Sequence, residues 1–172
     1  ILFLLPVVLL LLGVLVCLVL EAAGTPVGAR KRGVRIHLAM FTLFVSVAAL
    51  VQLQVFRNVV QLDETIFNVI LSDHLGYLGG GLALVLLIFT VFLAIPTLRV
   101  LQKDIGEIYV LLLLATISNI VLAYAVDLIL VGTALVLSFV SSISLCVLAQ
   151  ERSRGAEAAM KITLVSATIL SV

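Results

Sequence analysis

Two long apolar runs with a single acidic residue between them constrain this chain more than any other feature. The runs cover residues 108–126 and 128–149, and Asp127 separates them. Each is about 20 residues long, and at about 1.5 Å per residue a helix of that length crosses the hydrocarbon core of a bilayer. We therefore predict a membrane hairpin of two helices that turns at Asp127.

The composition assigns the rest of the chain to the same class of protein. Of the 172 residues, 64% are hydrophobic and 11% are charged. A soluble domain of this length would not combine so much apolar sequence with so little charge. The runs also lack the alternation of polar and apolar residues that is typical of a membrane β-barrel. The prediction is an all-α, polytopic bundle of about six transmembrane helices.

The other predicted helices are apolar stretches of similar length. They lie at about residues 1–20, 37–56 and 75–98, and a sixth begins near Ala156. Residues 57–74 are partly amphipathic, and we expect this segment to lie along one membrane surface. The chain is thus divided into residues 1–74, with the first two helices and the surface segment, and residues 75–172, with the last four helices.

Positive charge is concentrated on one side of the predicted bundle. Because helices alternate in direction, the loops after the first, third and fifth helices share one side of the membrane. Those loops contain eight of the ten basic residues, which are Arg30, Lys31, Arg32, Arg35, Arg99, Lys103, Arg152 and Arg154. Basic loops stay on the cytoplasmic or matrix side, so we predict that the N-terminus faces the opposite, proton-rich side.

Lys161 is the strongest candidate for a functional side chain. With a sixth helix that begins near Ala156, Lys161 lies about one and a half turns inside that helix. A charged side chain there is costly and often marks a functional site. Glu157 lies four residues earlier, in the order that favours an ion pair. The alternative is a lysine that extends to the membrane surface and is held by a local ion pair.

Other polar and small residues are candidates for a role in the turn, in packing or in a proton pathway. Asp127 is a third proton-pathway candidate, because it lies at the proton-rich side, but turn formation is the alternative. The serines of the fifth helix either join helices or hold a file of water, and we favour packing; they are Ser138, Ser141, Ser142 and Ser144. Gly76 and Gly80 have the four-residue spacing that lets another helix approach closely, so they predict a packing face.

Several classes of chemistry are not expected. Cys17 and Cys146 lie inside apolar runs and are typical of small packing residues. His37 and His74 fall near opposite membrane faces, so they cannot jointly bind a haem or a metal ion. No nucleotide-binding or nucleophile motif is present, and no basic patch with interleaved aromatics indicates nucleic acid. We expect no cofactor and no catalytic residue on this chain.

Short motifs in the second half of the chain occur in a characteristic order. They are GEIYVL at 106–111, AT at 115–116, DL at 127–128, RSR at 152–154 and EAAMK at 157–161. In this order the chain resembles the antiporter-like membrane subunits of respiratory complex I, and among them subunit 2, called the N subunit in bacteria. The resemblance extends from about Asp73 to the end, and it identifies residues 75–172 as the start of the antiporter-like core.

This resemblance implies a non-redox subunit in the membrane arm of proton-pumping NADH:quinone oxidoreductase. Such a subunit scaffolds its neighbours and contributes to a proton half-channel, here through Lys161. The implied partners are other membrane-arm subunits and membrane lipids. The implied location is the mitochondrial inner membrane, with the bacterial plasma membrane as the alternative.

Two departures from the family change the expectation. Family members have many more helices than six, so we expect a fragment or a split form that another chain completes. The family also places a glutamate in the fifth helix, and here that position falls on Ala134, Val136 or Phe139, none of which is acidic. The alternatives are a small cation/proton antiporter that acts as an oligomer and a helix bundle without a transport role.

Overall fold

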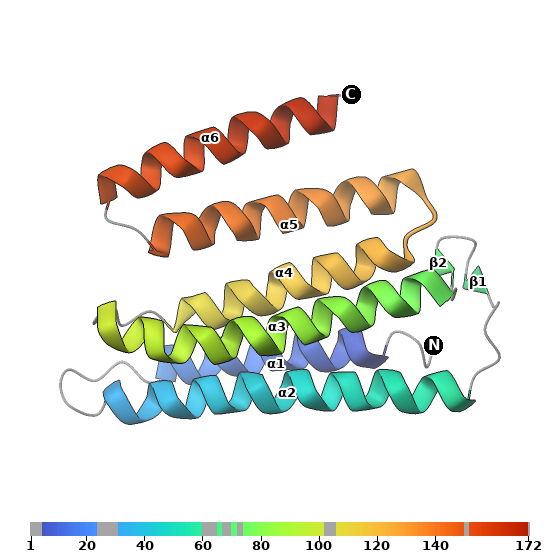
Figure 1. Ribbon diagram of the computed structural model, residues 1–172, viewed down its shortest axis with the longest axis horizontal. Coiled ribbons are helices and arrows are strands. Elements are labelled where there is room, and N and C mark those ends of the chain that lie inside the picture. The colour runs from blue at the N-terminus through green and yellow to red at the C-terminus, as the bar shows by residue number, and fades with distance from the viewer. Residues whose placement is uncertain are drawn as a thin grey trace.

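The computed structural model is all-helical apart from one short hairpin (Figure 1). The described residues are 5–23, 31–59, 65–66, 70–71, 74–101, 106–149 and 152–171. They contain six helices, which are α1 (Leu5–Ala23), α2 (Lys31–Val59), α3 (His74–Leu101), α4 (Glu107–Tyr124), α5 (Leu128–Ala149) and α6 (Arg152–Ser171).

Four of these helices are long and apolar enough to cross a bilayer. Within the described residues, the candidate spans are His37–Val55 in α2, Leu75–Pro96 in α3, Glu107–Tyr124 in α4 and Leu128–Leu148 in α5. Leu5–Glu21 in α1 is a shorter apolar helix, and α6 is not among the four. The chain is therefore a helical membrane bundle, as its sequence predicts.

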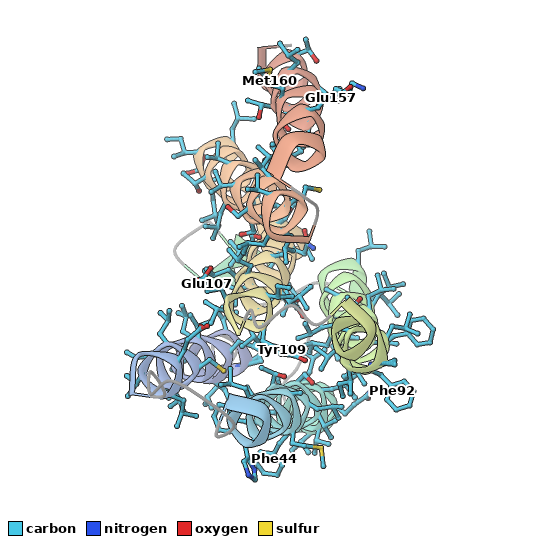
Figure 2. The ribbon with its side chains drawn as sticks, turned by 90° about the vertical axis from the view of Figure 1, so that its left-hand side faces the viewer. Phe44, Phe92, Glu107, Tyr109, Glu157 and Met160 are labelled. Carbon is cyan, nitrogen blue, oxygen red and sulfur yellow. The ribbon has the colours of Figure 1, made fainter. Side chains whose placement is uncertain are left out.

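Helices α1 to α4 form a four-helix bundle in which each helix packs against two neighbours. Helices α1 and α3 each contact both α2 and α4. The side chains of Leu10, Leu84 and Leu113 are completely buried in one continuous core, together with Cys17. Tyr109 of α4 points toward the middle of the four helices (Figure 2). Because this core uses side chains from all four helices, α1 and α2 form one packed unit with α3 and α4.

Helices α5 and α6 form an arm that extends away from this bundle. Helix α5 packs on α4, and α6 packs on α5 (Figures 1 and 2). Half of the residues in the α4 span are buried, but only 11% of those in the α5 span. No described residue of α5 or α6 belongs to the main hydrophobic core. The arm therefore has large faces that no other described part of the chain covers.

The predicted boundaries of the basic loops were wrong. Helix α2 begins at Lys31, and α3 continues to Leu101, past Arg99. Helix α6 begins at Arg152 rather than near Ala156. Lysine and arginine are good helix formers, so a helix can continue beyond its apolar stretch. These three helix ends lie together at one end of the molecule, on the left in Figure 1, whereas Arg30 and Lys103 lie outside the described residues.

The connection between α2 and α3 contains a short hairpin. Strands β1 (Thr65–Ile66) and β2 (Ile70–Leu71) pair antiparallel, with Thr65 opposite Leu71 and Ile66 opposite Ile70. The predicted surface segment, residues 57–74, is thus divided: residues 57–59 continue α2, the hairpin follows, and His74 begins α3. The hairpin lies at the end of the molecule opposite the basic helix ends (Figure 1).

Candidate functional site

Glu157 and Lys161 form an ion pair on α6. The Lys161 Nζ donates to Glu157 Oε1 at 2.7 Å, and the side chains are 73% exposed for Lys161 and 67% exposed for Glu157. Since α6 begins at Arg152, Lys161 lies about two and a half turns inside the helix. That is deeper than its sequence predicts, and it places the ammonium group near the middle of α6.

The location of this ion pair is more informative about function than its contribution to stability. In water, an exposed pair at this spacing stabilises a helix by only about 0.3–0.5 kcal/mol. At the depth of the hydrocarbon, a charged side chain is costly unless water or protein groups surround it. Figure 2 shows Glu157 on α6, at the far end of the arm from the bundle. The exposed face of α6 thus combines this charged pair with apolar side chains such as Leu164.

Asp127 caps the N-terminus of α5. The Ile129 N–H donates to Asp127 Oδ1 at 3.3 Å, and the Val131 N–H donates to the Asp127 backbone oxygen at 2.9 Å. A carboxylate at this position satisfies a helical N–H group that has no partner within the helix. The sequence allows Asp127 a role in a proton pathway or in turn formation, and these hydrogen bonds are those of turn formation.

The serines of α5 differ in their hydrogen bonds. Ser141, Ser142 and Ser144 each donate to a backbone oxygen four residues earlier, at 2.8 Å. Ser138 instead donates to Asn119 Oδ1 on α4, at 3.3 Å. Asn119 did not stand out in the sequence, although it is the one amide side chain in the apolar run 108–126. The hydroxyl of Ser138 therefore links the arm to the bundle.

Gly76 and Gly80 face α4 near its C-terminal end. A Cβ atom on Gly80 would lie 3.0 Å from the Tyr124 hydroxyl oxygen, and one on Gly76 would meet the Tyr124 ring and lie 3.0 Å from the Ala123 carbonyl oxygen. The absence of side chains at both glycines lets the aromatic ring of Tyr124 pack directly on α3. The two glycines thus position α3 against α4.

A pair of acidic residues that the sequence did not single out meets at the start of α4. Glu21 follows the apolar stretch of α1, and a Cβ atom on Gly106 would lie 2.8 Å from Glu21 Oε1. The Glu21 carboxylate accepts a hydrogen bond from the Glu107 backbone N–H. Burial raises the pKa of Glu21, and the nearby Glu107 carboxylate raises it further. These two effects outweigh the hydrogen bond, which by itself would lower the pKa. This contact fixes the end of α1 against α4.

No family model matches the chain, and no curated protein matches it significantly. The functional argument therefore depends on the arrangement of the side chains. The structure brings together Glu157 with Lys161, Asn119 with Ser138, and Glu21 with Glu107. Asp127 lies apart from these pairs, at the turn between α4 and α5.

Proposed function

We propose that this chain is a non-redox subunit in the membrane arm of a proton-pumping NADH:quinone oxidoreductase. The observation that carries the proposal is the Glu157–Lys161 ion pair, which lies near the middle of α6 with both side chains exposed. In this proposal α6 crosses the membrane, where charges of this kind belong to proton pathways or to contacts with other chains. The motifs between residues 106 and 161 that resemble subunit 2 indicate the class of enzyme.

In this proposal Lys161 is the proton-carrying group of a half-channel. Movement of a neighbouring subunit against α6 would change the distance between the Lys161 ammonium group and the Glu157 carboxylate. The chain supplies no redox group and participates in the enzyme only as a subunit.

The arm is the proposed surface for the neighbouring subunits. Leu164 and Val165 of α6 and Val140 of α5 are among its exposed apolar side chains, and a partner chain with the remaining helices of the antiporter-like fold would cover them. We propose the mitochondrial inner membrane as the location, with the bacterial plasma membrane as the alternative, and the basic helix ends on the matrix or cytoplasmic side.

Proton pumping by intact membranes tests the role of Lys161. In Lys161→Met, we expect NADH-driven pumping to decrease severalfold, because methionine cannot hold a proton. Met160→Leu is the matched control, since Met160 is its neighbour on α6 and is also exposed. If Lys161→Met pumps as well as the wild type, the half-channel role is wrong.

A native gel tests the assembly separately. We expect the chain to migrate with a large band that oxidises NADH. Migration as a small homo-oligomer would contradict the respiratory proposal and support the independent antiporter instead.

A further inference from the structure

We draw no further inference here: the strongest candidate, the apolar groove along the exposed face of α2 between Phe44 and Val55, carries nothing because no described part of the structure shows what covers it.

Discussion

Helices α4 and α5 are joined by a three-residue connection, residues 125–127, and they have similar apolar sequences, yet they have different surroundings. Helix α4 lies between α1, α3 and α5, and half of its span is buried. Helix α5 contacts α4 on one side and α6 on the other, and 11% of its span is buried. The comparison teaches that apolar composition determines which segments enter a membrane, but not which of them form a core.

The glycines and the polar groups also differ between the closely packed bundle and the exposed arm. Gly76 and Gly80 in the bundle face the Tyr124 ring. Among the described residues, by contrast, no atom outside the local backbone of α5 lies within 4 Å of a Cβ atom placed on Gly132 of the arm. Thr42 and Ser46 in the bundle are buried and donate to backbone oxygens of their own helix. Glu157 and Lys161 in the arm are exposed. The bundle is packed within this chain, and the arm is the region where partners are expected.

The largest expected effect comes from removing volume in the core of the bundle. Leu113→Ala should lower the free energy of unfolding by about 2–5 kcal/mol, because Leu113 is completely buried and the change leaves a cavity. Val140→Ala on the outer face of α5 is the control and should have little effect. The measurement is unfolding in a mild detergent, and equal losses in both variants would contradict the division into bundle and arm.

The second-largest difference between bundle and arm is expected when a glycine in each is replaced by alanine. Gly76→Ala should cost about 1–3 kcal/mol, because its Cβ atom would overlap the Tyr124 ring. Gly132→Ala makes the same change on α5, where space is open, and there the higher helix propensity of alanine should leave stability unchanged or raise it. The same unfolding measurement applies. A stable Gly76→Ala protein would show that α3 and α4 can separate without cost.

A smaller effect is expected at the contact between α1 and α4. In Gly106→Ala, the new methyl group would displace the Glu21 carboxylate from the Glu107 N–H, with a loss of about 0.5–1.5 kcal/mol. In a Glu21→Ala background, the same change should cost nearly nothing, since no carboxylate remains to be displaced. If the losses in free energy of unfolding from Gly106→Ala and Glu21→Ala add in the double variant, the two residues act separately.

The same contact predicts a dependence of stability on pH. The pKa of Glu21 in the folded state is raised above its ordinary value of 4.5, so between these two pKa values the folded state holds a proton that the unfolded state releases. This contribution to stability is complete below pH 4.5 and decreases as the pH rises through the folded pKa. Glu21→Gln should remove this part of the pH dependence, and an unaltered profile in that variant would assign it to another group.

The smallest effect on stability is expected on α6. Glu157→Gln should change the free energy of unfolding by about 0.5 kcal/mol or less, because both members of the ion pair are exposed. A loss as large as that of Leu113→Ala would mean that the pair stabilises the bundle. We instead expect substitutions in the arm to affect pumping and assembly much more than folding.

Local features of the structure were predictable from the sequence, and distant contacts were not. The span 128–149 coincides with α5, and Glu157 pairs with Lys161, because both features depend on neighbours within one helix. The contact of Glu21 with Gly106 joins residues from separate helices, and no periodicity in the sequence relates them. The helix ends at Lys31 and Arg152 were missed because hydropathy marks the edge of the hydrocarbon, whereas a helix ends where its backbone hydrogen bonds stop.

By itself, the sequence determined that the chain is a helical membrane protein with a turn at Asp127, since the length and polarity of a segment decide whether it can span a bilayer. Only the tertiary structure decided that α1 to α4 share a core while α5 and α6 extend from it. In a membrane an apolar side chain is equally well accommodated by lipid and by another helix, so close packing selects which helices meet. That selection depends on small residues and ring shapes such as those of Gly76 and Tyr124, which are brought together from separate helices.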